Sequence, residues 1–325
     1  MNKKLYIELI FLVILGALTS LSLPPFNYFI INFFTLSLFF IFLIKKLNQH
    51  KNKKLFFIYG WSFGFGYFLT NLYWISISLK FDQNFQFLIP LTVILIPTFL
   101  ALFYGLISYF FLIFKPKKII SSFFTFSLIF GILEFIRGSI LTGFPWNLIA
   151  YSFSGQSELL NITSIIGTYG FNLFCVSLFT CPALFVLINT KKHIAIFLTL
   201  LFFVLIFYVH GSSNKEKFEE TVKQNFDYKL RVIGSNIGIE RFYKDVNTTK
   251  IIKDLIEISN PIANEKTIFI WPEGIFPNIS QEELINYNSL FKKKFSENHL
   301  LIIGINSQLE RNSSQDYFNS LTIYD

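Results

Sequence analysis

The chain has 325 residues, of which 53% are hydrophobic and only 15% are charged. This balance excludes an ordinary water-soluble domain and indicates a membrane protein. The net charge of +8 does not indicate a nucleic-acid partner, because the lysines lie in short clusters between apolar segments and do not form a basic groove.

The first part of the chain, residues 1–210, is predicted to be a transmembrane helical domain. A helix that crosses a bilayer needs about 20 mostly apolar residues. The first apolar segment is not a signal peptide, because no small-residue cleavage site follows it and Pro24-Pro25 leads directly into the next one. We therefore expect a bundle of seven spans, at residues 5–23, 26–44, 55–79, 87–114, 119–141, 159–188 and 194–209.

The lysines predict the orientation of this bundle. They precede the first span and follow the second, fourth and sixth, whereas the other loops contain essentially only Lys80. Positive residues favour the cytoplasmic side. The N-terminus is therefore expected inside, and everything after His210 outside.

The Glu134–Arg137 pair and Trp146, in or next to the fifth span, each have a structural and a functional interpretation. Glu134 and Arg137 lie three residues apart near the outer end of the fifth span, where an ionisable pair faces a bundle interior or a watery cavity. It is either a structural pair or part of a lipid site. Trp146 follows a helix break at Gly143-Phe144-Pro145 and is either an interfacial anchor or part of a loop that shapes a headgroup site.

Other residues of the spans have plainer interpretations. Tyr67, Tyr73 and Trp74, at the outer end of the third span, are predicted to belong to an aromatic belt. Cys175 and Cys181 lie in the sixth span without a nearby His or carboxylate, so we expect buried small residues, no disulfide and no metal site.

After His210 the pattern changes to a linker, 211–228, with one helical stretch, and an α/β domain, 229–325. Four runs read as strands and two as helices, one of them opened by the capping box Ser280–Glu283. This order is typical of the start of an α/β sandwich. The strands are expected at 230–237, 267–271, 300–305 and 318–324, and the helices at 245–259 and about 280–295.

Glu273 directly follows the predicted strand 267–271. Side chains at the carboxyl ends of such strands open into the crevice where α/β domains bind ligands. A carboxylate held there, partly desolvated, can act as a general base. The alternative is a salt-bridged or capping residue.

The chain resembles the apolipoprotein N-acyltransferases, membrane-bound members of the nitrilase superfamily that complete bacterial lipoproteins in the inner membrane. The resemblance covers nearly the whole chain and rests on the order of several short motifs. These are Leu23-Pro24-Pro25-Phe26, Gly60–Gly66, Asn71–Trp74, Glu134–Gly138, Thr142–Trp146, Gly167–Gly170, Ser235-Asn236-Ile237 and Trp271-Pro272-Glu273.

The resemblance implies a nitrilase-like αββα domain with a Glu–Lys–Cys triad and no cofactor. The Cys would take an acyl chain from a phospholipid, expected to be phosphatidylethanolamine, and pass it to the amine of a diacylglyceryl-cysteine on an apolipoprotein. Glu273 matches the family's Glu, the general base. Neither Lys292–Lys294 nor the two cysteines match the other two residues, which the family has after the fourth strand.

We therefore expect residues 1–325 to be a fragment that is inactive without the missing Lys and Cys. Asn236 departs from the family, which more often has a Gln-bearing sequence in this strand. Two other functions remain open: a non-enzymatic membrane protein for binding or transport, and a membrane-tethered nitrilase-type amidase.

Overall fold

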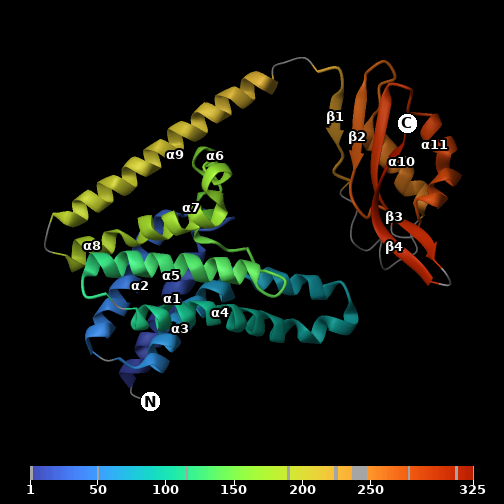
Figure 1. The fold of residues 1–325 in the computed structure, drawn as a ribbon. Coiled ribbons are helices and arrows are strands. Elements are labelled where there is room, and N and C mark those ends of the chain that lie inside the picture. Colours follow the sequence, from blue (N-terminus) through green and yellow to red (C-terminus); the bar gives the residue numbers. More distant parts are fainter. Residues whose placement is uncertain are drawn as a thin grey trace. The chain divides into compact units, whose positions relative to one another are not determined.

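The computed structural model describes residues 3–49, 51–114, 116–188, 191–222, 226–235, 247–276, 279–311 and 314–324. The chain forms two compact units, residues 1–221 and 222–325, and each is described by itself. Figure 1 shows helices in the first unit and a sheet with helices in the second.

The first unit is all-helical. Its long helices are α1 (Lys3–Ser20), α2 (Ile30–Gln49), α3 (Lys53–Asn71), α4 (Ile89–Ile113), α5 (Ile119–Ser139), α7 (Thr163–Thr180) and α9 (Lys192–Val222). Shorter helical pieces connect them: η1 (Tyr73–Lys80), η2 (Gln83–Leu88), η3 (Ile149–Phe153), α6 (Ser157–Leu160) and α8 (Pro182–Leu187).

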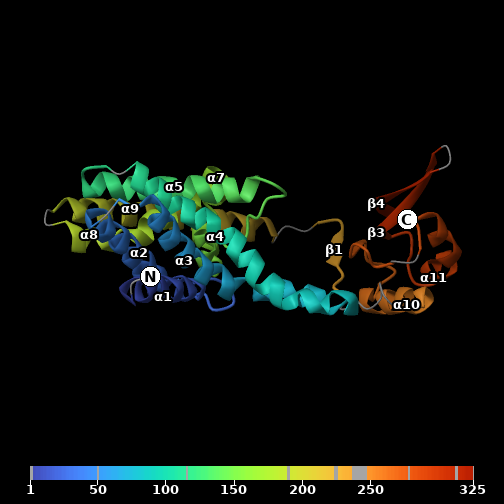
Figure 2. The ribbon, with the colours of Figure 1, turned by 90° about the horizontal axis from the view of Figure 1, so that it is seen from below.

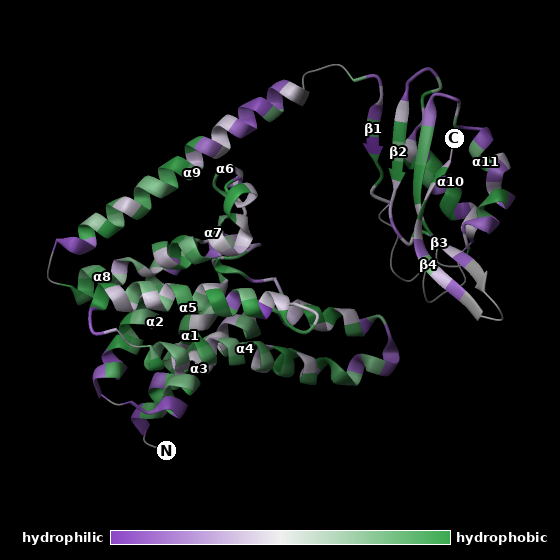
Figure 3. Ribbon diagram, viewed as in Figure 1, coloured by the Kyte–Doolittle hydropathy of each residue, from purple (hydrophilic) through white to green (hydrophobic). Residues whose placement is uncertain are grey.

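Among the described residues, five helical segments are long and apolar enough to cross a membrane: 30–49, 83–113, 119–139, 163–187 and 192–221. Figure 3 shows the apolar character of these helices. The other two predicted spans are helical, as α1 and α3, but are not among the five. In α1 the 18 residues include Lys3, Lys4 and Glu8, and α3 carries two Lys, three Gly, two Tyr and one Asn, which lower its hydropathy.

Three predicted spans differ in detail from the helices. The third ends at Asn71, and 3₁₀ turns follow. The sixth is interrupted at Gly167, which has a φ of 72° and ψ of 163°, and again before Pro182. The seventh continues as α9 to Val222, through most of the residues for which a linker was predicted, because a polar helical extension follows the apolar part.

Phenylalanine rings fill the interior of the bundle. Phe39 stacks on Phe63 with ring centroids 4.2 Å apart, and rings from α5 and α4 contact this pair, Phe126 against Phe39 and Tyr104 against Phe63. Close helix contact depends on Gly66, where a Cβ atom would lie 1.9 Å from the carbonyl oxygen of Val13. The bundle therefore holds α3 tightly against α1, and α3 supplies one wall behind the site described below.

The second unit contains a four-stranded sheet in the order β1 (Lys229–Val232), β2 (Thr267–Trp271), β3 (His299–Arg311) and β4 (Ser314–Tyr324). The first three strands are parallel and β4 is antiparallel to β3. All four overlap the predicted strands, although β1 is shorter and β3 and β4 are longer. A long β3–β4 hairpin accounts for the extra length, since its pairing runs to Arg311 and Ser314.

Helices α10 (Thr248–Ser259) and α11 (Asn288–Lys292) lie on one face of this sheet (Figures 1 and 2). Phe269 and Trp271 of β2 point into the core beneath them, and the Trp271 indole donates to the Ser259 hydroxyl over 3.0 Å. On the opposite face Leu230 and Val232 remain 64% and 69% exposed. The mixed sheet with helices on one face fits part of an α/β domain of the nitrilase-like type.

The predicted helix at 280–295 is shorter and tighter than expected. Its capping contact exists, since the Ser280 amide donates to a Glu283 carboxylate oxygen over 2.8 Å. The residues that follow form a 3₁₀ helix, Glu282–Tyr287, and then α11, which ends at Lys292.

Candidate functional site

Glu134 and Arg137 form an ion pair inside the bundle. Their closest atoms, Oε2 and Nη2, are 2.5 Å apart, and each residue is only 1% exposed. The Arg137 guanidinium lies over the rings of Phe68 and Phe144, at 5.3 Å and 5.7 Å from their centroids. Ion pairing and ring contacts together offset the cost of burying a charge at this depth.

Arg137 also holds the segment that follows its helix, the 140–147 loop. Nη1 of Arg137 donates to the carbonyl oxygens of Phe144, over 2.7 Å, and Trp146, over 2.9 Å. The Tyr151 hydroxyl donates to the Pro145 carbonyl over 3.3 Å, and the Tyr67 hydroxyl to that of Asn147 over 2.9 Å. Four consecutive carbonyls, 144–147, therefore each accept a side-chain donor. We call these three donor side chains the carbonyl clamp.

The carbonyl clamp explains how an irregular loop can follow a membrane helix. Residues 143–146 have no regular secondary structure, and Leu141, Gly143 and Asn147 have positive φ angles. At membrane depth a backbone without internal hydrogen bonds must be satisfied by other protein groups. Tyr67 meets this need and is completely buried, so its prediction as a belt residue is wrong. Tyr73 and Trp74 are exposed.

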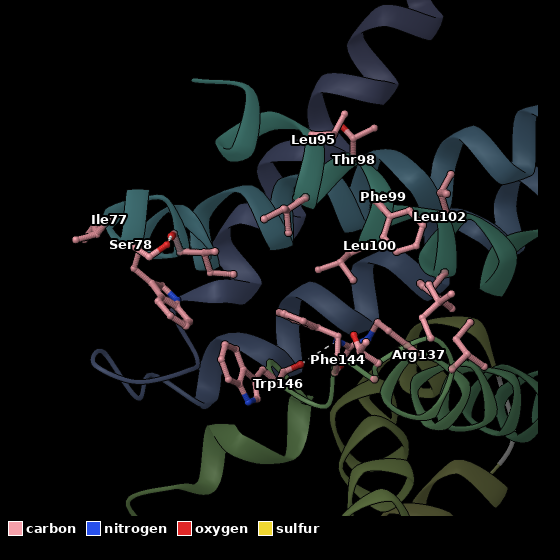
Figure 4. A pocket seen from close by; sticks show the side chains of 18 of the residues that line it. Ile77, Ser78, Leu95, Thr98, Phe99, Leu100, Leu102, Arg137, Phe144 and Trp146 are labelled. Carbon is pink, nitrogen blue, oxygen red and sulfur yellow. Dashed lines mark hydrogen bonds between the residues drawn. The ribbon is translucent and has the colours of Figure 1, made fainter. Parts of the chain in front are cut away.

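A cavity of about 1090 Å³ lies beside the 140–147 loop, within the first unit (Figure 4). It is bounded by η1, by α4 around Pro97, by the end of α5 and by the loop itself. The lining is almost entirely hydrocarbon. Arg137 is the only ionisable residue in it and is covered by its own contacts, so the cavity fits an apolar ligand. The lining residues are Trp74, Ile75, Ile77, Ser78, Phe81, Leu95, Ile96, Thr98, Phe99, Leu100, Leu102, Phe103, Arg137, Ile140, Leu141, Thr142, Gly143, Phe144 and Trp146.

Two tryptophans meet at one end of this cavity. The rings of Trp74, from η1, and Trp146, from the loop, have centroids 5.3 Å apart. They are 43% and 50% exposed, and the lining residues Leu95 and Leu141 are 57% and 82% exposed, so the cavity is open at this end and elsewhere along its lining. In the view of Figure 4, Trp146 lies toward the end near Ser78, and Leu102 lies at the other. We call the Trp74–Trp146 end the mouth of the cavity.

Glu273 lies in the second unit, in the turn directly after β2. Gly274 has a φ of 59° there, and a Cβ atom on Gly304 of β3 would lie 2.7 Å from the Glu273 Cα. A glycine at 304 is thus required for the backbone of Glu273 to pass so close. The Glu273 carboxylate accepts a hydrogen bond from the Asn319 amide of β4. Its side chain is exposed, which differs from the partial desolvation expected.

The remaining sequence candidates lie elsewhere. Cys175 and Cys181 are free thiols with no exposed surface, in α7 and at its end. Lys292 ends α11, and Lys293 and Lys294 follow it. Asn236 lies outside the described residues. The structure thus brings Glu134, Arg137 and Trp146 together around one loop, and places Glu273 in the other unit.

The comparisons with known proteins identify the family. The family model described as the apolipoprotein N-acyltransferase N-terminal domain matches residues 15–181, which include every residue of the cavity, the mouth and the carbonyl clamp. The chain belongs to the apolipoprotein N-acyltransferase family.

Individual relatives of this family agree. The apolipoprotein N-acyltransferase of Rhodopseudomonas palustris is 28% identical over 81% of this chain and 50% of its own length. That of Rhizobium leguminosarum bv. trifolii is 26% identical over 95% of this chain and 60% of its own length. That of Rhizobium etli is 34% identical over 52% of this chain and 33% of its own length. The chain therefore spans about half to three fifths of the length of the first two relatives.

The sequence analysis missed Tyr67 and Tyr151 as functional candidates. A hydroxyl that serves a distant carbonyl has no local sequence pattern, since Tyr67 and Asn147 are 80 residues apart. One available signal was the non-helical stretch 143–146 beside a buried arginine, because its carbonyls needed donors.

Proposed function

We propose that this protein takes part in the N-acylation of lipoproteins, transferring an acyl chain from a phospholipid to the terminal amine of a diacylglyceryl-cysteine. The observation that carries the proposal is the large apolar cavity in the part of the chain that matches the family model. Its volume of about 1090 Å³ is slightly above the ~300–1,000 Å³ of most small-molecule sites. The cavity suits the hydrocarbon part of a lipid.

The chemistry that we propose begins with a cysteine thiolate. Its sulfur attacks the ester carbonyl of the phospholipid, the C–O bond breaks, and the lysophospholipid leaves with a proton. The lipoprotein amine then attacks the thioester and restores the thiolate. Glu273 is proposed as the general base that takes the thiol proton and then the amine proton, because its carboxylate is exposed at a strand end.

The nucleophile is proposed to lie outside the thiols of residues 1–325. Cys175 and Cys181 have no exposed surface and are surrounded by apolar side chains of the bundle. A thiolate is disfavoured in such surroundings, and an acyl ester has no access to either sulfur. We also propose that a Lys elsewhere stabilises the oxyanion, because Lys292, Lys293 and Lys294 belong to the end of α11 and not to the Glu273 turn.

The membrane arrangement that we propose has seven spans, with α1 and α3 crossing together with the five longer helices. The lysine pattern supports a cytoplasmic N-terminus and a second unit on the outer side of the inner membrane. Phosphatidylethanolamine is proposed as the acyl donor, and Arg137, Glu134 and Trp146 as the residues that shape the donor's entry region.

A substitution at Glu273 tests the proposed base. Glu273→Gln, made in the protein expressed from the complete gene, keeps the shape and the bond from Asn319 but removes the base. We expect acyl-enzyme formation from a labelled phospholipid to fall at least about 10²-fold. The matched control is Glu297→Gln, which removes an exposed carboxylate elsewhere in the same unit. Thioester formation at the normal rate in Glu273→Gln would exclude this carboxylate as the base.

A second experiment tests the thiols. Residues 1–325, purified in detergent with phosphatidylethanolamine that carries a labelled acyl chain, should retain no hydroxylamine-sensitive label. Stoichiometric labelling, lost in a Cys175→Ala or Cys181→Ala variant, would show that a buried thiol is the nucleophile after all.

A further inference from the structure

One row of side chains on η1 lines the cavity and ends in a lysine. In a 3₁₀ helix the side chains of residues three apart lie directly above one another. Trp74 and Ile77 form such a row, and both line the cavity, at 43% and 45% exposure. Lys80 is the next member of the row, about 6 Å beyond Ile77, and it is exposed. Ser78 and Phe81, which flank it in the sequence, also line the cavity, and Figure 4 shows Ile77 and Ser78 together at one edge. Lys80 therefore lies at the rim of the cavity.

The positive charge of Lys80 is unusual for its place in the chain and has no partner. Lys80 is the only Lys or Arg in the loops after the first, third and fifth predicted spans, residues 24–25, 80–86 and 142–158. Lysines are less frequent in loops on the outer side of a membrane. Among the described residues, no carboxylate forms an ion pair with its ammonium. Asp82, two residues later, instead accepts the backbone amide of Asn84 over 2.9 Å. The cation is therefore available to a ligand.

The openings of the cavity along α4 are unsuitable for a charged group. Leu95, Phe99 and Leu102 are 57%, 45% and 38% exposed there, within the apolar segment 83–113. A phosphate without a partner is costly in apolar surroundings. Arg137, the only cation of the lining, is already bonded to its own carboxylate and to two loop carbonyls. A phosphate attached to a chain in the cavity is therefore best placed at the end of η1, beside Lys80.

We infer that Lys80 binds the phosphate of a lipid whose hydrocarbon chain lies in the cavity. An ammonium is a compact charge that donates to phosphate oxygens, and its apolar stem can lie along the rim. The row on η1 then matches the order of groups in such a lipid, with Trp74 and Ile77 against hydrocarbon and Lys80 against phosphate. The identity of this lipid as the acyl donor rests on the proposed function, whereas the phosphate contact does not.

Two lipids that differ only at the phosphate test the inference. The protein expressed from the complete gene is purified in a nonionic detergent. Its Kd is measured, by energy transfer from tryptophan to pyrene, for phosphatidylethanolamine and for a diacylglycerol with the same pyrene-labelled chains. Lys80→Gln should weaken the binding of phosphatidylethanolamine about fivefold, as expected for one lysine at a membrane surface. It should leave the affinity for the diacylglycerol unchanged, because that lipid has no phosphate.

Two further variants serve as controls. Lys80→Arg keeps the charge and should keep most of the affinity for phosphatidylethanolamine. Lys51→Gln removes an exposed lysine elsewhere in the first unit and should change neither affinity. An equal loss of affinity for both lipids in Lys80→Gln would mean that Lys80 acts through packing, and no loss for either lipid would exclude the contact. Both results would overturn the inference.

Inorganic phosphate distinguishes a lipid headgroup from free phosphate. Added at millimolar concentration in place of chloride, at constant ionic strength, it should displace neither lipid, because a single exposed lysine binds a free anion weakly. Displacement of phosphatidylethanolamine alone would assign the site to free phosphate and contradict the inference. Failure of the proposed function gives a different result: acyl transfer would be absent from the complete protein, while Lys80→Gln would still weaken only the phospholipid, since binding needs no chemistry.

Discussion

The guanidinium of Arg137 contacts both a buried carboxylate and the backbone of the loop that lines the cavity. Arg137 uses one nitrogen for Glu134 and another for two carbonyls of the 140–147 loop. Sequence analysis left two interpretations of the Glu134–Arg137 pair open, a structural one and a role at a lipid site. The geometry links them, because the residue that balances the buried carboxylate also fixes the loop that lines the cavity.

Removing the carboxylate of the pair should be costly. In Glu134→Gln the Arg137 guanidinium stays buried without its counter-charge, and we expect a loss of stability of about 3–5 kcal/mol. Thermal unfolding in detergent measures it. Glu8→Gln is the matched control: Glu8 pairs with Lys46 at 2.6 Å, but its side chain keeps 16% exposure against 1% for Glu134. Equal melting temperatures for the two variants would show that burial of Arg137 does not depend on Glu134.

At the scale of single residues, sequence analysis could predict a role only where its cause lies in the neighbouring sequence. Glu134 and Arg137 were visible as charges within an apolar run, and Trp146 as an aromatic residue after a helix break. The completely buried Tyr67 looked like one of several aromatics at a span end. Its role depends on a carbonyl 80 residues away, which only the packing of α3 beside the loop brings within reach.

Among the elements, the polar end of α9 is held by a short helix. A Cβ atom on Gly211 would lie 1.9 Å from the Glu158 carbonyl oxygen, so only glycine allows α9 to pass α6 so closely. In the turn of α9 that follows this contact, the Asn214 amide donates to the Asn161 side chain over 2.6 Å, and Lys215 pairs with Glu158 at 2.8 Å. Sequence analysis predicted a linker with one helical stretch here because the residues are polar, and polar residues that pair across helices make that stretch an extension of α9.

The ion pair at this contact should give a pH dependence. The hydrogen bond from Lys215 is the main cause that lowers the pKa of Glu158 from its usual 4.5 to about 2, with help from its own backbone amide and the Ser157 hydroxyl. A carboxyl whose pKa is lowered on folding contributes stability above its unfolded pKa. That contribution disappears as the pH falls from about 4.5 towards 2.

Melting temperatures of the protein and of Lys215→Met, measured from pH 6 to pH 2, isolate this contribution. The difference between the two should be largest at pH 6 and should vanish near the acid end, and it should be small because the pair is solvent-exposed and screened by salt. Glu158→Gln should abolish the difference at every pH. A difference that is constant with pH would mean that Lys215 acts through packing and not through Glu158.

At the scale of the whole chain, hydropathy predicted the order of a helical membrane unit and an α/β unit. Periodicity also found all four strands, since continuous apolar runs such as 267–271 give a clear signal. The cavity could not be predicted, because it depends on where Gly143 turns the chain, on how η1 folds back and on the side chains of α4. All the residues that line the cavity lie within residues 15–181, the part of the chain that the family model matches.

The orientation in the membrane is the last prediction, and the lysine clusters carry it. If the N-terminus is cytoplasmic and seven helices cross, residue 51 lies inside and the polar end of α9 outside. Lys51→Cys and Ser213→Cys place a thiol at exposed positions of the two sides, without disturbing the contacts of Asn52 or Asn214. The native thiols, Cys175 and Cys181, have no exposed surface and should give little background. In cells with a permeabilised outer membrane, a membrane-impermeant maleimide should label position 213 and should reach position 51 only after lysis. Labelling of 51 but not of 213 would invert the bundle. Labelling of both in unlysed cells would mean an even number of crossings between them, which would remove α3, the helix between them that is not among the five long apolar segments, from the spans that the lysine pattern requires.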